Sequence, residues 1–336
     1  MVVDTANPSN PTIPPQLQAE FDALVRLSAK VGQDPLLVQG AGGNTSLKIG
    51  DVMWIKASGT NLGDALERNI FVPTAWKDIA RSLKEGSPEA DQPAAFLLGD
   101  GSLRPSIETC LHAIFDAAVV VHVHCVSTIA LAVLRDGEQR IKQRLPDIEW
   151  AWVPYRRPGA ELGRMLLERR RTENVAILGN HGLLVAANSV AEAEILLEEV
   201  CYKLRLVAAS GAGKTPDPAP DGYKPLTTDH ALAKAMTVQR LREIALGGNM
   251  YPDHVIFCGP KIGSAEKPSG EILIVDPEGR VFIKADANTG AEALAGCLGN
   301  VLLRLPDHIE VNYLTIEDAA SLLNWDAEKY RQSLNV

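Results

Sequence analysis

Apolar residues recur at helical spacing in several segments of the chain. Between residues 15 and 31, apolar side chains recur mostly three or four positions apart, at Leu17, Phe21, Leu24, Val25 and Leu27. This period predicts an amphipathic helix, which Gly32 ends. Residues 161–170 predict a second helix, and residues 189–209 a third. Ser189 and Glu192 have the spacing of a capping box at the start of that third helix.

Short runs rich in β-branched residues lie between these helices and predict strands. The predicted strands of the first two thirds of the chain are residues 52–55, 119–124, 148–153, 175–178 and 183–185. Residues 76–92 predict a polar helix followed by an exposed connection. Strands interspersed with helices indicate an α/β fold.

The composition changes near residue 210. Residues 210–220 are rich in Gly, Pro and Ala and predict a linker between a main domain, residues 15–209, and a smaller α/β unit, residues 221–336. Residues 1–14 predict a disordered tail. The elements expected in the smaller unit are a strand over 253–258, a hairpin formed by 271–275 and 280–284, and a helix over about 290–304.

Two histidines at the end of the most apolar strand are the first candidates for chemistry. Side chains of residues i and i+2 on a strand share one face, so His122 and His124 place two imidazoles about 6.5–7 Å apart at Cα. That spacing suits two ligands of one metal ion, with metal–nitrogen distances of about 2.0–2.1 Å. The alternative is a pair of core histidines, each with a local hydrogen bond. We favour the metal, because burying two imidazoles on an apolar strand is costly without partners.

His181 is the natural third ligand. It lies between glycines where the predicted strand 175–178 leads into the next strand. Three protein ligands leave a position open for water or substrate, which is the pattern of catalytic rather than structural zinc. His112, four residues after Glu108, is interpreted as structural, as are His230, His254 and His308. Cys125 should face away from His124 on the strand.

Two loops of small residues predict an anion site. Glycines cluster at residues 38–46, and hydroxyls and glycine follow the strand 52–55 in Lys56-Ala-Ser58-Gly59-Thr60. Converging backbone N–H groups in such loops bind phosphate or an oxyanion, although a simple hairpin turn also fits the first loop. The segment GAGKT at 211–215 is not a phosphate-binding P-loop, because Ala208 stands where the motif needs glycine.

Composition narrows the class of protein. A net charge of −9 argues against a general nucleic-acid or anionic-membrane binder. No apolar run is long enough to span a membrane, and the N-terminal residues lack the features of a signal peptide. The five cysteines are scattered and odd in number, which fits reduced thiols. We therefore expect a cytoplasmic protein that binds neither membranes nor nucleic acid.

Six short motifs occur in the order of a known family. They are Gly43-Asn44-Thr45-Ser46, Ser58-Gly59-Thr60, Pro105-Ser106-Ile107-Glu108, His122-Val-His124, Val153-Pro154-Tyr155 and His181-Gly182-Leu183. With them, residues 17–209 resemble the class II aldolase/adducin family, which includes fuculose- and rhamnulose-phosphate aldolases. Residues 221–336 are similar to the tail of the aldolase half of bifunctional rhamnulose-phosphate aldolase/dehydrogenases.

The resemblance implies a fold and a role for each matched residue. The implied fold is an α/β/α sandwich around a mostly antiparallel sheet, and the implied assembly is a homo-oligomer, a tetramer. The implied ligands of Zn²⁺ (or Mn²⁺, Co²⁺ or Fe²⁺) are the three histidines. Glu108 is the implied acid/base, and Tyr155 a proton donor that reaches across a subunit boundary. The implied substrate-binding positions are Gly43, Asn44, Ser58, Gly59 and Ser106.

The resemblance implies a lyase that cleaves a ketose 1-phosphate to dihydroxyacetone phosphate and an aldehyde through a metal-stabilised enediolate. One residue differs from the family pattern at the implied phosphate site. Ile107 stands where fuculose-phosphate aldolase has a second phosphate-contacting serine, and a lost neutral hydrogen bond is worth about 0.5–1.5 kcal/mol. A sugar acid whose carboxylate meets Lys56 is therefore an alternative substrate. The alternative functions are a decarboxylase of a 3-oxo sugar acid, then a sugar-phosphate 4-epimerase, then a non-catalytic adducin-like module.

Overall fold

The computed structural model describes residues 11–215 and 218–326. Most of the predicted tail, residues 1–10, lies outside the described residues. In the predicted linker, the described residues form neither helix nor strand. The last strand of one sheet ends at Ala187 and the first strand of a second sheet begins at Tyr223, so the two sheets lie on opposite sides of the linker in the sequence.

The first sheet has seven strands in the order β3-β2-β1-β4-β7-β6-β5. Their bounds are β1 Asn44–Ile49, β2 Val52–Lys56, β3 Phe71–Ala75, β4 Val119–Val123, β5 Trp150–Val153, β6 Val175–Leu178 and β7 Gly182–Ala187. Neighbouring strands pair antiparallel except β5 with β6, which pair parallel. The mostly antiparallel sheet that the sequence led us to expect is confirmed.

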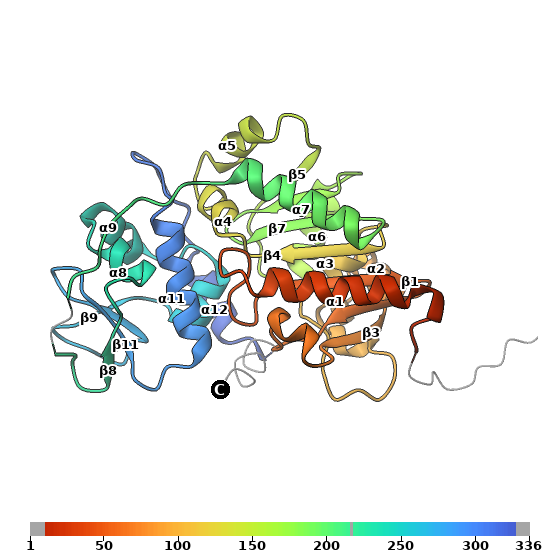
Figure 1. The fold of residues 1–336 in the computed structure, drawn as a ribbon, viewed down its shortest axis with the longest axis horizontal. Helices are drawn as coiled ribbons and strands as arrows, with labels where there is room; N and C mark the ends of the chain where they lie inside the picture. Colours follow the sequence, from red (N-terminus) through yellow and green to blue (C-terminus); the bar gives the residue numbers. More distant parts are fainter. Residues whose placement is uncertain (1–10, 216–217, 327–336) are drawn as a thin grey trace, which may run out of the picture.

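Helices cover both faces of this sheet. In the central strand β4, Val119, Val121 and Val123 belong to one buried apolar cluster, and Val120 belongs to another. The first cluster contains α1 Gln18–Gly32, α5 Gly137–Arg144 and α7 Val190–Leu204. The second contains α2 Trp76–Glu85, α3 Thr109–Ala113 and α6 Ala160–Arg169. Figure 1 shows α1 and α7 lying along one side of the strands, with α2, α3 and α6 behind them. The fold is therefore an α/β/α sandwich, as predicted.

The helix α7 differs from its prediction only at its end. The Ser189 hydroxyl accepts a hydrogen bond from the Glu192 backbone N–H, as the capping pattern indicates. The helix ends at Leu204, several residues before the predicted end at 209.

A second unit contains a four-stranded sheet in the order β8-β11-β10-β9. Its strands are β8 Tyr223–Pro225, β9 Gly263–Ser264, β10 Leu273–Val275 and β11 Val281–Lys284. Its helices are α8 Ala231–Met236, α9 Gln239–Gly247, α10 Pro252–Cys258, α11 Thr289–Leu302 and α12 Ile316–Leu323. The hairpin of β10 and β11 and the helix after it match the sequence prediction.

The prediction of a strand over residues 253–258 was wrong, because this segment is the helix α10. All of its residues are buried, so its apolar run has no polar face whose period could separate helix from strand. Pro252 at the first helical position, with Asp253 in the first turn, was the missed signal of a helix start.

The second unit packs against the first through α4 Val126–Ala132, the helix that follows β4. Apolar side chains of α4 and of the residues just after it belong to the same buried cluster as α8, α10 and α11. Leu134 and Val311 form an isolated antiparallel bridge between the units. Figure 1 shows α11 and α12 between the second sheet and the first unit. In the described part of the chain, every helix is too short or too polar to cross a membrane.

Candidate metal centre and substrate pocket

Three segments of the first unit bring the candidate residues together. His122 lies near the end of β4 and His124 directly after that strand, while Glu108 immediately precedes α3. His181 lies in the tight turn between β6 and β7. Asn180 in that turn adopts a left-handed conformation with φ 54°, which asparagine tolerates better than most residues. Because β7 pairs with β4, the turn that precedes β7 lies beside His122 and His124.

The next residue, Gly182, has to be glycine for this approach. A Cβ atom added there would lie 2.5 Å from the Val123 carbonyl oxygen, which is closer than any real contact. A side chain at this position would push β7 away from β4. It would thereby separate His181 from the other two histidines.

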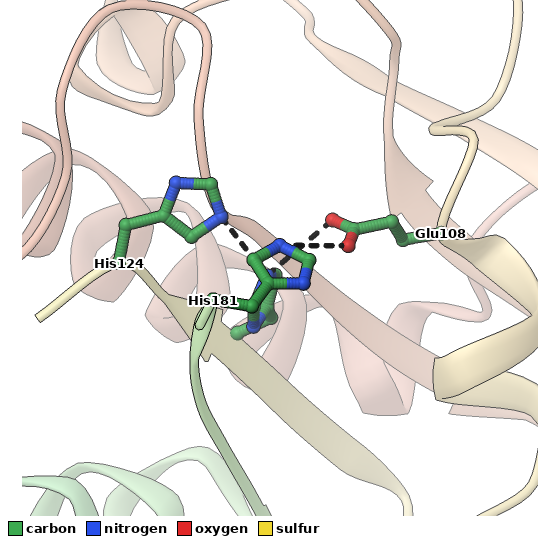
Figure 2. A group of neighbouring side chains, drawn as sticks. Glu108, His124 and His181 are labelled. Atoms are coloured by element: carbon green, nitrogen blue, oxygen red, sulfur yellow. Dashed lines mark hydrogen bonds and ion pairs between the residues drawn. The ribbon is translucent and has the colours of Figure 1, made fainter. Parts of the chain in front are cut away.

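The four side chains converge on one small volume. His122 Nε2 and His124 Nε2 are 3.1 Å apart. The Glu108 carboxylate lies 3.4 Å from His122 Nε2 through Oε2 and 3.3 Å from His181 Nε2 through Oε1. One candidate ligand atom from each of the four residues lies within 4.8 Å of the other three. Figure 2 shows His124 and His181 turned toward the Glu108 carboxylate.

Hydrogen bonds at the far side of two rings indicate where their protons lie. His122 Nδ1 is 3.0 Å from the Leu183 carbonyl oxygen, and His124 Nδ1 is 2.9 Å from Asp253 Oδ2. A carbonyl and a carboxylate only accept hydrogen bonds, so each Nδ1 carries the proton. With Nδ1 protonated on both rings, Nε2 is the atom of each ring that faces the centre, and the two Nε2 atoms lie 3.1 Å apart.

This donor set fits a divalent cation. Two imidazole nitrogens turned toward each other at that distance suit two ligands of a single ion. Glu108 Oε1 is also buried and accepts no hydrogen bond from the described residues. Three imidazoles and a carboxylate are ligands that zinc binds well. His122, His124 and His181 would hold the ion, with Glu108 beside it.

Burial controls the protonation of these groups. It lowers the pKa of His181 to about 3, and it also lowers the pKa of His122. Burial alone would raise the pKa of Glu108, but the neighbouring histidines and a hydrogen bond from Asn44 outweigh it and bring that pKa to about 2. At neutral pH His122 and His181 are therefore neutral and Glu108 is ionised, the forms in which these groups bind metal.

Asn44 connects the carboxylate to its surroundings. Its Nδ2 donates to Glu108 Oε2 at 3.0 Å and to Ser106 Oγ at 3.2 Å. Its Oδ1 accepts a hydrogen bond from His112 Nε2, and His112 Nδ1 is 2.7 Å from Ser46 Oγ. His112 lies outside the group of ligand atoms, and its ring fixes which way the Asn44 amide points. The amide in turn orients Glu108.

The predicted substrate residues line one cavity beside this centre. The lining includes all five predicted substrate positions, namely Gly43, Asn44, Ser58, Gly59 and Ser106. Glu108, His124 and His181 also line it, together with Lys56 and Ile107. Pro252, Asp253 and Ile256 of α10 complete the wall, so both units contribute to it. Lys56 is buried, and its Nζ donates to the Ala41 carbonyl oxygen at 2.9 Å.

Tyr155 does not line this cavity. It follows β5 and lines a second cavity with Asn180, Asn312 and Tyr313. Its hydroxyl is buried and has no hydrogen-bond partner among the described residues. Burial, with Asp318 and Glu161 nearby, raises the pKa of the phenol. Its role as a proton donor stays a prediction.

Sequence reasoning missed Asp253. It lies next to His124 in space but belongs to α10, and it was interpreted as the first residue of a strand. No motif or spacing in the sequence links Asp253 to the histidines. Cys125 belongs to the apolar cluster under α1 and α7, away from the ligand atoms, as predicted.

A family model identifies the chain's relatives. The model of the class II aldolase and adducin N-terminal domain matches residues 22–207, more than half of the chain. The chain belongs to the class II aldolase and adducin family. The second unit lies beyond the matched residues.

Individual relatives are more distant. An uncharacterized oxidoreductase, YuxG, of Bacillus subtilis (strain 168) is 28% identical over 204 residues. The match spans 56% of this chain and only 28% of that relative's length.

Two solved structures are similar to the family region. The N-terminal class II aldolase domain of a conserved protein from Thermoplasma acidophilum has 24% identity and a TM-score of 0.49, covering 58% of this chain and 97% of that one. L-Fuculose-1-phosphate aldolase from Thermus thermophilus has 15% identity and a TM-score of 0.39, covering 56% and 93%.

Proposed function

We propose that the protein is a metal-dependent aldolase that interconverts a ketose 1-phosphate with dihydroxyacetone phosphate and an aldehyde. The observation that carries the proposal is the Glu108 carboxylate within 3.4 Å of imidazole nitrogens that point at one another. This cluster opens onto a cavity lined by small, polar and glycine residues. A basic group beside a cation site is what the chemistry of a carbanion next to a carbonyl requires.

Glu108 is the proposed base in the addition direction. Its ionised carboxylate removes a proton from the hydroxymethylene carbon of dihydroxyacetone phosphate, and the electron pair moves toward the carbonyl oxygen. The enediolate so formed attacks the aldehyde carbon and makes the new carbon–carbon bond. Cleavage follows the same steps in reverse. A divalent cation held by the three histidines supplies Lewis-acid stabilisation of the negative charge on the substrate oxygens.

The remaining roles follow from the cavity. Asn44, Ser58 and Ser106 offer side-chain donors, and Gly43 and Gly59 allow backbone N–H groups to approach a phosphate. The proposed assembly is a homotetramer. In it, Tyr155 donates a proton to the aldehyde oxygen in the active site of a neighbouring subunit.

A decarboxylase of a 3-oxo sugar acid is the second candidate. The specific observation in its favour is Lys56, a buried lysine on the cavity wall. Ile107 also lines this cavity and stands where an aldolase of this family has a phosphate-contacting serine. An ammonium group there suits a substrate carboxylate. Loss of carbon dioxide leaves the same kind of enediolate, and Glu108 would pass a proton from solvent water to its carbon, leaving hydroxide to be neutralised in bulk water.

The first experiment needs no knowledge of the aldehyde. Zinc-loaded protein is incubated with dihydroxyacetone phosphate in heavy water, and deuterium entering the hydroxymethylene carbon is followed by NMR. We expect stereospecific exchange by the native protein and none by Glu108→Gln. Exchange that persists at the native rate in Glu108→Gln refutes the assignment of the base. No exchange by a native protein with one zinc per chain rejects the aldolase and directs the search to 3-oxo sugar acids.

A further inference from the structure

The second unit reaches into the candidate metal centre through one side chain. Asp253, in the first turn of α10, places Oδ2 2.9 Å from His124 Nδ1. Both side chains are nearly inaccessible, at 5% and 6% exposure. Asp253 lies outside the family region, residues 22–207, although its partner is a predicted metal ligand inside it.

The three histidines differ in what meets the ring nitrogen that faces away from the centre. His122 Nδ1 meets a backbone carbonyl, and His124 Nδ1 meets the Asp253 carboxylate. His181 Nδ1 is buried and has no hydrogen-bond partner among the described residues. A carboxylate at this position fixes the ring orientation and makes the opposite nitrogen a stronger ligand. Of the three rings, His124 therefore has the strongest orienting partner.

Asp253 is held by the core of the second unit. Tyr251, directly before α10, is almost completely buried, and its ring lies 5.5 Å from that of His254. The helix itself packs on α11 and α12. The position of the carboxylate is therefore set by how the second unit folds.

A second contact joins this unit to another ligand-bearing segment. Asn180, next to His181, donates from Nδ2 to the carbonyl oxygens of Met250 and Asn312 at 2.8 and 2.7 Å. Met250 lies just before α10. The second unit thus touches the segments of two candidate ligands, and at His124 it does so with a charged group.

We propose that Asp253 is a positioning residue of the metal centre, whose carboxylate accepts the His124 Nδ1–H and holds the ring with Nε2 toward the ion. The second unit is then part of the centre within the same chain. This inference rests on the proposed metal-dependent function and extends it, because it assigns a role to a residue outside the family region.

Metal affinity tests the inference without any assay of turnover. Full-length Asp253→Asn and Asp253→Ala are compared with the native chain by zinc competition against a chromophoric chelator. We expect zinc affinity to fall about 10–100-fold in Asp253→Ala, the usual effect of losing an outer-shell partner. Asp253→Asn should lose less, because the amide oxygen still accepts the hydrogen bond without the charge. Visible absorption of the Co²⁺-loaded proteins should also change in both variants.

A matched control separates positioning from general loosening of the structure. Val311→Ala removes buried apolar volume where Val311 bridges to Leu134, and Val311 lies outside both the candidate ligand group and the cavity lining. Its zinc affinity should be native, although its stability falls. Circular dichroism establishes that each variant is folded before its affinity is measured.

The possible outcomes distinguish this inference from the proposed function. Native zinc affinity and a native Co²⁺ spectrum in both Asp253 variants overturn the inference alone. A loss in Val311→Ala as large as in Asp253→Ala also overturns it, since any damage to the contact between units would then suffice. A native chain that binds no zinc overturns the metal centre itself, and with it both proposals.

Discussion

Replacing Glu108 by glutamine should destabilise the metal-free protein and remove most of the catalysis. The neighbouring histidines and Asn44 lower the pKa of Glu108 to about 2, so the ionised carboxylate contributes to stability at neutral pH. Burial keeps the His181 ring neutral, and its Nδ1 has no hydrogen-bond partner among the described residues, so we place the ring proton on Nε2, 3.3 Å from Glu108 Oε1. Glutamine has a single acceptor oxygen. Its NH₂ group must therefore face either this Nε2–H or the Asn44 Nδ2 that donates to Glu108 at 3.0 Å.

The size of the loss follows from that one lost interaction. A hydrogen bond to a charged group contributes about 1.5–3 kcal/mol to the free energy of unfolding. Unfolding entropies near 2.1 cal/mol/K per residue give roughly 0.7 kcal/mol/K for 336 residues, so the Tm should fall by about 2–4 °C. Turnover should fall by a factor on the order of 10²–10⁴, the usual contribution of a general base.

The assay is urea denaturation of chelator-treated protein at pH 7.5. Glu67→Gln is the control, because Glu67 is exposed and remote from the centre; its free energy of unfolding should be unchanged. If metal-free Glu108→Gln were instead as stable as the native protein or more stable, the carboxylate would gain nothing from the His181 Nε2–H. The assignment of the His181 proton to Nε2 would then be wrong.

Further predictions concern pH, metal and substrate. Burial lowers the pKa of His181 to about 3, so between pH 6.5 and 3 the unfolded chain binds a proton that the folded chain does not. The free energy of unfolding of the metal-free protein should therefore fall as the pH drops through this window, by up to about 1.4 kcal/mol per unit, and urea titrations of His181→Asn should show a shallower slope. Removing the metal should lower stability by about 2.7 kcal/mol relative to protein at a free zinc concentration of 100 Kd, and an equal Tm with and without chelator would contradict the centre. Tyr155→Phe should leave deuterium exchange into dihydroxyacetone phosphate intact but slow carbon–carbon bond formation, and loss of both activities would contradict its role at the aldehyde. Lys56→Met should raise KM for a sugar acid more than for a ketose phosphate if the decarboxylase assignment holds, and an unchanged ratio would count against it.

The sequence alone determined much of this centre, because its main features are local. Alternation along a strand has a period of two, so His122 and His124 had to share a face wherever the strand lies. Glycines and hydroxyls in the loop before β1 and in the loop after β2 predicted an anion site. Both loops do line the cavity beside Glu108. The mostly antiparallel sheet followed from the ordered family motifs. The shared face of the two histidines and the loops depend on the backbone of a few neighbouring residues, whereas the sheet was implied by the resemblance.

Only the tertiary structure decided which distant residues meet the centre. His112 was interpreted as structural, but its ring holds the Asn44 amide that orients Glu108. Asp253 was assigned to a strand, because a wholly buried apolar segment carries no periodicity that separates strand from helix. Its contact with His124 joins two units whose packing depends on complementary side-chain shapes across α4, α10 and α11. No local sequence pattern encodes such complementarity. The contact between the Asp253 carboxylate and His124 could therefore be identified only from the packing of the two units.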